Sequence, residues 1–259
     1  MVHLADSSSC TGVRRGSIRT ETLDIRSVAM GYEPLVTQNP LRVLKLGRDN
    51  KQLGLVMARA GLGKTALLVQ IALDAILRGN QVIHVTIDES IDKTRAWYDD
   101  ILQFILEEHA VNRPHELIEM VKRHRMIMTF KESAFSRAKL EERLNDLVLQ
   151  DIFKPNCVVV DGFDFENTGR EDLEDIKDLM ESMSLQAWFS ATCHRNDQRM
   201  SPAGVPAPCH EVDDLFDTVV LLKPKDGVIE LDIVRNQGEA DTTTSVLKLD
   251  PTTMMVKEG

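Results

Sequence analysis

The chain has 259 residues, of which 42% are hydrophobic and 28% charged, and its formal net charge is -10. This length and apolar content suffice for a sizeable core in one or two domains, whereas the acidic balance disfavours tight binding to long nucleic acids, because basic groups dominate duplex affinity. No apolar run is long enough to cross a bilayer, and the amino-terminal sequence lacks a secretory h-region. We therefore expect a cytoplasmic protein without membrane insertion.

Residues 1–40 carry serine, arginine and threonine with no sustained apolar period. Such a composition is typical of an extended or disordered arm. From residue 41 onward, apolar runs of strand length alternate with longer helical patterns. This alternation predicts one α/β domain over 41–259, with a doubly wound, mostly parallel sheet and helices on both faces.

The expected elements follow one another regularly along the chain. Strands of the parallel part are expected at 53–57, 81–87, 125–130, 156–161 and 186–192. Helices are expected at 64–79, 93–110, 136–150 and 170–183. Turn residues separate the last apolar runs, which predicts an antiparallel C-terminal extension of the sheet formed by 217–223, 228–234 and 245–250.

The segment ARAGLGKTA lies between an expected strand and an expected helix, and it matches the loop G-x-x-x-x-G-K-[S/T] except at its first position. The backbone N–H groups of that loop converge on phosphates, its lysine reaches the terminal phosphates and its hydroxyl holds Mg²⁺. Alanine is the least intrusive replacement for the first glycine where no positive φ is needed. The competing interpretation is a glycine-rich turn without a ligand. We expect ATP and Mg²⁺ to bind at Ala58, Arg59, Ala60, Gly61, Leu62, Gly63, Lys64, Thr65 and Ala66.

A carboxylate ends the apolar run CVVVD downstream of this loop, at Asp161. Carboxylates in that position can hold Mg²⁺ through its water shell. We therefore expect Thr65 and Asp161 to form the metal site. The competing interpretation is that Asp161 only caps the turn that follows it.

Two further carboxylates, Asp88 and Glu89, follow the strand after the loop's helix. Ligands of open α/β sheets bind at the carboxyl ends of the strands. A carboxylate there can orient and deprotonate the water that attacks a γ-phosphate, so both residues are candidates for the catalytic acid. The competing interpretation is a helix N-cap, formed by Asp88 or Ser90 ahead of Ile91.

In this order, the motifs resemble those of RecA-like ATPases, in the branch that holds the DnaB-type replicative helicases and the KaiC-like ATPases. The loop ARAGLGKTA looks like the helicase form, which often begins with alanine, and VTIDES resembles the strand with the catalytic glutamate. The segment AWFSATCHR is similar to the sensor strand, with Thr192 as the polar sensor, and HEVDDLFDTVVLL resembles the helicase segment that follows. The resemblance spans about 41–256 and implies a RecA-like fold and ATP hydrolysis.

The closing segment IVRNQGEADTTTSVLKLDPTTMMV looks like the family's hairpin, whose arginine contacts the nucleotide of a neighbouring subunit. The resemblance assigns this role to Arg235 and implies a homo-oligomer, ring or filament, with nucleotide at subunit interfaces. The lysine expected two residues earlier is replaced by Ile233. A surface arginine paired with Glu239 or Asp241 is the equally weighted alternative.

Forty residues are too few for the helical domain that precedes the helicase core, so we do not expect a replicative helicase. The acidic balance also disfavours, without excluding, nucleic acid as a partner. We expect a Mg-ATP-binding ATPase that couples slow hydrolysis to oligomer assembly or to regulation of a protein partner. The alternatives are a nucleotide-dependent switch with negligible turnover and a DNA-remodelling accessory ATPase.

Overall fold

The computed structural model describes residues 32–44, 52–236, 239–240 and 247–259. Its strands are β1 Leu53–Ala58, β2 Val82–Ile87, β3 Arg125–Phe130, β4 Cys157–Asp161, β5 Gln186–Thr192, β6 Thr218–Lys225, β7 Val228–Asn236, β8 Glu239–Ala240, β9 Leu247–Leu249 and β10 Val256–Glu258. They form one sheet in the order β10-β9-β7-β6-β1-β5-β4-β2-β3, with β8 beside β7. The pairs among β1 to β6 are parallel, whereas β7, β8, β9 and β10 pair antiparallel. The predicted mostly parallel sheet with an antiparallel C-terminal extension is thus confirmed.

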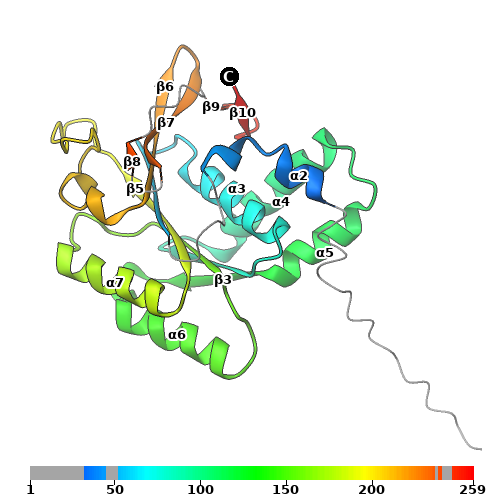
Figure 1. Ribbon diagram of the computed structural model, residues 1–259, viewed down its shortest axis with the longest axis horizontal. Coiled ribbons are helices and arrows are strands. Elements are labelled where there is room, and N and C mark those ends of the chain that lie inside the picture. The colour runs from blue at the N-terminus through cyan, green and yellow to red at the C-terminus, as the bar shows by residue number, and fades with distance from the viewer. Residues whose placement is uncertain (1–31, 45–51, 237–238, 241–246) are drawn as a thin grey trace, which may run out of the picture.

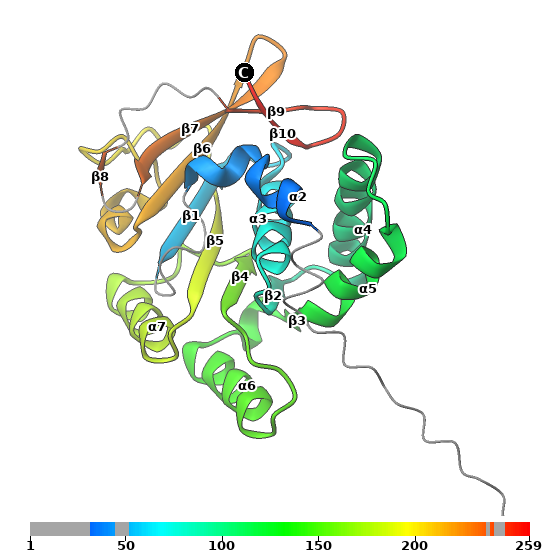
Figure 2. The same cartoon turned by 45° about the vertical axis from the view of Figure 1, so that its right-hand side comes forward.

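Helices cover both faces of this sheet (Figures 1 and 2). The α-helices are α2 Glu33–Thr37, α3 Lys64–Leu77, α4 Ile91–Glu108, α5 Pro114–His124, α6 Arg137–Leu149 and α7 Arg170–Ser182. Short 3-10 helices are η1 Pro40–Leu44, η2 Glu132–Ala134, η3 Cys209–Glu211 and η4 Asp213–Leu215. In both views α3, α4 and α5 lie on one side of the sheet, and α6 and α7 lie on the other. Within the described ranges, no helix is both long and apolar enough to cross a membrane.

Two apolar cores, one on each face, fix the central strand β1 between them. Val56 points into the core with α3 and α4, and Leu55 and Met57 point into the core with α6 and α7. This alternation follows from the two-residue period of a strand, and burial on both faces explains why β1 is apolar throughout. A Cβ at Gly54 would lie 2.4 Å from the ring of Trp188, so glycine makes room for that ring.

Two parts of the fold differ from the expectation. The helix α5 was not predicted, although a proline opens it and Leu117, Met120 and Val121 form its buried stripe. Of the predicted arm, 1–40, residues 1–31 lie outside the described residues. Its remaining part includes α2 and packs into the core through Leu35. A short helix of this kind takes its stability from tertiary packing, which a weak local pattern does not reveal.

Candidate functional site

The segment between β1 and α3 contains two glycines in the left-handed backbone region. Gly61 and Gly63 adopt φ of 77° and 87°, in the left-handed region that favours glycine. Ala58 instead belongs to β1, where it pairs with Thr192 of β5, and it is not among the described residues with positive φ. The condition for alanine at the first position of the loop is therefore met.

The amino terminus of α3 has no side-chain cap, unlike those of α4 and α6. Ser90 caps α4 and Ser136 caps α6, each by accepting a backbone N–H bond, whereas Gly63 gives α3 no side-chain cap. The N–H groups of the first turn have no partner within their own helix, and together with the helix dipole they favour an anion. An anion at the start of α3 would therefore meet N–H groups that no side chain caps.

Lys64 folds back over the loop from the first position of α3. Its Nζ donates to the carbonyl oxygens of Ala58 and Arg59, each at 3.4 Å. Burial lowers the pKa of this ammonium, and the negative charge of Asp161 opposes that shift. These carbonyl contacts are long, so a phosphate that offers shorter charge-assisted bonds can displace them.

Thr65 and Asp161, the two predicted metal ligands, are in contact. The Thr65 hydroxyl donates to Oδ2 of Asp161 at 2.6 Å. The two residues are 96 positions apart in the sequence, and α3 and β4 bring them together. The buried Ser190 hydroxyl donates to the other carboxylate oxygen at 2.5 Å and accepts the N–H of Gly162 at 3.1 Å. Ser190 was not predicted; its signal in the sequence is a hydroxyl two positions before Thr192 in an apolar strand.

A cavity of about 180 Å³ opens between the start of α4 and the ends of β2 and β4. The residues that line it are Thr65, Thr86, Ile87, Glu89, Lys93, Thr94, Trp97, Asp161 and Gly162. Threonine hydroxyls, two carboxylates and one ammonium group therefore share one small space beside the loop. Such convergence of polar groups on a concave surface is typical of a ligand site.

The structure separates the two candidate catalytic acids. Glu89 lines the cavity, with Oε1 accepting the Ser90 N–H at 3.1 Å and Oε2 paired with the Lys93 ammonium. Asp88 has φ of 56°, and its carboxylate accepts the N–H of Glu132 at 3.2 Å. Glu89 therefore faces the predicted phosphate site, while Asp88 holds the loop after β3. The alternative N-cap is also present, because Ser90 Oγ accepts the N–H of Lys93 at 3.2 Å.

The other two predicted residues lie apart from the cavity. Thr192 is opposite Ala58 at the carboxyl end of β5, so it borders the loop without lining that space. Arg235 is opposite Val219, which is level with Leu55 near the amino end of β1. The structure therefore does not bring Arg235 to the loop of its own chain.

Arg235 has its partners inside its own chain. Its guanidinium donates to the carbonyl oxygens of Asp213 and Phe216, the latter at 3.2 Å, and lies 3.3 Å from the Asp213 carboxylate. The predicted alternative partners, Asp241 and the side chain of Glu239, lie outside the described residues. Asp213 is thus the acidic partner that the sequence did not indicate.

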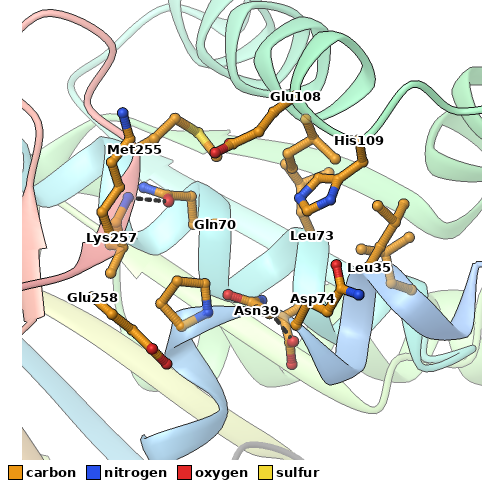
Figure 3. Close-up of a pocket in the computed structure, with 15 residues that line it drawn as sticks. Leu35, Asn39, Gln70, Leu73, Asp74, Glu108, His109, Met255, Lys257 and Glu258 are labelled. Carbon is orange, nitrogen blue, oxygen red and sulfur yellow. Dashed lines mark hydrogen bonds between the residues drawn. The ribbon is translucent and has the colours of Figure 1, made fainter. Parts of the chain in front are cut away.

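A larger cavity, of about 290 Å³, lies away from the loop between α2, α3, α4 and β10 (Figure 3). Its main polar groups are already matched within the chain. Asp74 accepts from Asn39 at 2.8 Å and from Arg78 at 2.6 Å. Gln70 donates to the Met254 carbonyl at 2.8 Å, and it accepts the N–H of Val256 at 2.9 Å. These groups tie the C-terminal strand and the residue before η1 to α3, so size alone does not make this cavity the better ligand site.

The carboxyl edge of the sheet thus gathers Lys64, Thr65, Glu89, Asp161 and Ser190 around one glycine-containing turn. No family model matches the chain, and a search of curated proteins finds no match to it. Function is therefore inferred from the chemistry of these side chains.

Proposed function

We propose that the chain is a RecA-like ATPase that binds Mg-ATP at Ala58–Ala66 and hydrolyses it slowly. The observation that carries this proposal is the 2.6 Å contact between the Thr65 hydroxyl and Asp161 at the uncapped amino terminus of α3. A structural turn needs neither that contact nor an exposed helix end. A nucleoside triphosphate uses the helix end to bind its phosphates and the hydroxyl and carboxylate to hold their cation.

The residues at the turn fit a magnesium ion accompanied by phosphates. Mg²⁺ prefers oxygen ligands and is usually bound through one or two carboxylates together with substrate phosphates and waters. Thr65 and Asp161 would hold it, and the Ser190 hydroxyl fixes the orientation of the Asp161 carboxylate. When bound, the ion would neutralise part of the negative charge on the β- and γ-phosphates.

Glu89 is the residue that we propose as the general base. In hydrolysis, a water oxygen forms a bond to the γ-phosphorus while the bond from that phosphorus to the bridging oxygen of ADP breaks. The bond pair stays on the ADP oxygen. A proton of the water passes to Glu89 and from there to the released phosphate. Lys64 contributes positive charge to the terminal phosphates throughout.

Assembly into a ring or filament is part of the proposal, because Arg235 lies too far along the sheet to reach the loop of its own chain. A role for Arg235 at a nucleotide therefore requires a second subunit. We also propose a protein partner whose affinity depends on the bound nucleotide. A nucleotide-dependent switch with negligible turnover is the second candidate, favoured by the bonds that already engage both oxygens of Glu89.

The test is to measure ATP binding and steady-state phosphate release for the full chain and for Lys64→Ala. Loss of this ammonium should weaken ATP binding by roughly 1.5–3 kcal/mol, the range for a hydrogen bond to a charged group. Unchanged affinity in a folded Lys64→Ala variant would contradict the nucleotide site. Measurable intrinsic turnover supports the ATPase, and ATP-dependent assembly without turnover supports the switch. Turnover only with single-stranded DNA would instead support a DNA-remodelling accessory.

A further inference from the structure

We propose that Lys93 binds the γ-phosphate, and that its ion pair with Glu89 withholds the catalytic carboxylate until that phosphate arrives. The inference rests on the proposed function, since it names a further contact of the same site. Neither the phosphate-binding loop nor the metal site includes Lys93, which lies in the first turn of α4.

Lys93 supplies positive charge to the cavity that also contains Thr65 of the loop. Among the described residues that line this space, it is the one lysine or arginine. Thr65 and Asp161 line the same cavity. A phosphate bound in this space would lie between groups of the loop and the Lys93 ammonium.

The start of α4 holds Lys93 and Glu89 in a fixed relation. Ser90 caps the helix through the N–H of Lys93, and Glu89 immediately precedes this cap. One oxygen of Glu89 accepts the Ser90 N–H at 3.1 Å, and the other pairs with the Lys93 ammonium. Accepting a proton from water requires an oxygen that is directed at that water, so the pair hinders Glu89 as a base.

Electrostatics supports the same conclusion. The hydrogen bond from Lys93 is the first cause that lowers the pKa of Glu89, and a carboxylate with a lower pKa is a weaker base. The pair is also exposed, with 62% of the Lys93 side chain and 41% of the Glu89 side chain accessible. Exposed pairs of this type contribute little stability, so a ligand can replace one partner.

The terminal phosphate of ATP is such a ligand, because it concentrates negative charge on several acceptor oxygens. With ATP bound, the Lys93 ammonium passes from Glu89 to the γ-phosphate. Glu89 keeps its bond to the Ser90 N–H and stays at the cavity wall with one oxygen released. ADP lacks the γ-phosphate, so the pair stays closed. The carboxylate is thereby made available only when there is a phosphate to remove.

The test compares the affinities of the full chain for ATP and ADP, measured by calorimetric titration in the presence of Mg²⁺. Lys93→Met should weaken ATP binding on the order of 10–100-fold and leave ADP binding unchanged, since a charge-assisted bond to the γ-phosphate is lost. Lys93→Arg keeps the charge and should retain most of the ATP affinity. The matched control is Lys122→Met, which removes another exposed helical ion pair, at 3.1 Å from Glu119, and should change neither affinity.

Each result bears on one proposal or both. Equal losses for ATP and ADP in Lys93→Met, or no loss for either, would overturn the γ-phosphate contact. If Lys64→Ala weakens nucleotide binding while Lys93→Met does not, the proposed ATP site stands and only the role of Lys93 falls. If the unmodified chain binds neither nucleotide, both proposals fall. Lys93→Gln also removes the charge and gives the same comparison should the methionine variant not fold.

Discussion

Two ion pairs at opposite edges of the parallel strands differ in burial. At the carboxyl edge, 62% of the Lys93 side chain and 41% of the Glu89 side chain are exposed. Near the amino edge, the values for Arg235 and Asp213 are 17% and 11%. Exposed pairs contribute about 0–1 kcal/mol, whereas removal of one partner of a buried pair costs roughly 3–5 kcal/mol. The first pair can therefore exchange partners with a ligand, while the second acts as a structural tie.

Arg235 gives the largest expected effects, one on stability and one on rate. Arg235→Ala should lower the free energy of unfolding by roughly 3–5 kcal/mol, because Asp213 and two carbonyl contacts lose a largely buried partner. Chemical denaturation measures this loss. The control is Lys223→Ala, which removes an exposed pair at 2.5 Å from Asp232 in the same hairpin and should cost at most about 1 kcal/mol. Equal losses in the two variants would show that the buried pair is not a special tie.

The role of Arg235 across a subunit interface stays a prediction, with an effect of roughly 10³–10⁵ in rate where such arginines act in other phosphoryl-transfer proteins. Lys64→Ala subunits retain Arg235 and should restore turnover to Arg235→Ala subunits in mixed assemblies. Phosphate release from the mixture is compared with that from each variant alone. A mixture no more active than its components, or a chain that stays monomeric with ATP, would leave Arg235 with its structural role only.

The second prediction separates the adjacent acids at the carboxyl edge. Glu89→Gln should slow single-turnover hydrolysis by roughly 10²–10⁴-fold with ATP binding largely intact, because an amide cannot accept the proton of the attacking water. Asp88→Asn is the matched control. Asparagine tolerates the positive φ at this position, so this variant should retain turnover close to that of the unmodified chain. The opposite result would move the catalytic role to Asp88.

Much of this edge could be predicted because its signals are local. Three signals each fall within one short segment of sequence. They are the loop with Lys64 and Thr65, the apolar strand that ends in Asp161, and the strand β5. The partners of these residues could not be predicted in the same way. Ser190 reaches Asp161 only through the pairing of β4 with β5, and Asp213 reaches Arg235 only through the packing of η4 beside β7. Such contacts depend on tertiary placement.

The helix α5 and the pairing of Lys93 with Glu89 were missed for another reason. Their sequence signals were present but weak, since a polar segment after a proline is common in loops and a Glu-Lys pair four residues apart is common on helix surfaces. The proposed role of Lys93 is indicated only by the cavity that it lines together with Thr65. The sequence is therefore most informative about the loop and least informative about Lys93 and Glu89, which line the cavity beside it.

The third prediction compares the two glycines of the loop. Both adopt positive φ, which costs an alanine about 1–2 kcal/mol. A Cβ at Gly63 would also lie 2.5 Å from Leu249 Cδ2, whereas nothing lies within 4 Å of one at Gly61. Gly63→Ala should therefore lower the free energy of unfolding more than Gly61→Ala, by roughly 1–3 kcal/mol for overpacking. Equal losses in denaturation would show that the Leu249 side chain yields freely.

The smallest expected effect is a shift in the titration of Glu89 in the nucleotide-free chain. The hydrogen bond from Lys93 holds the pKa of Glu89 below its usual value, so Lys93→Met should raise it, while the distant Lys122→Met should not. A lowered pKa in the folded state stabilises the fold above the unfolded-state pKa, and this contribution is lost as the pH falls through the folded-state value. Lys93→Met should therefore flatten the acid limb of the stability curve slightly. Carbon-detected NMR titration of the Glu89 carboxyl measures the shift directly, and the same pKa with and without Lys93 would mean that the exposed pair does not persist in solution.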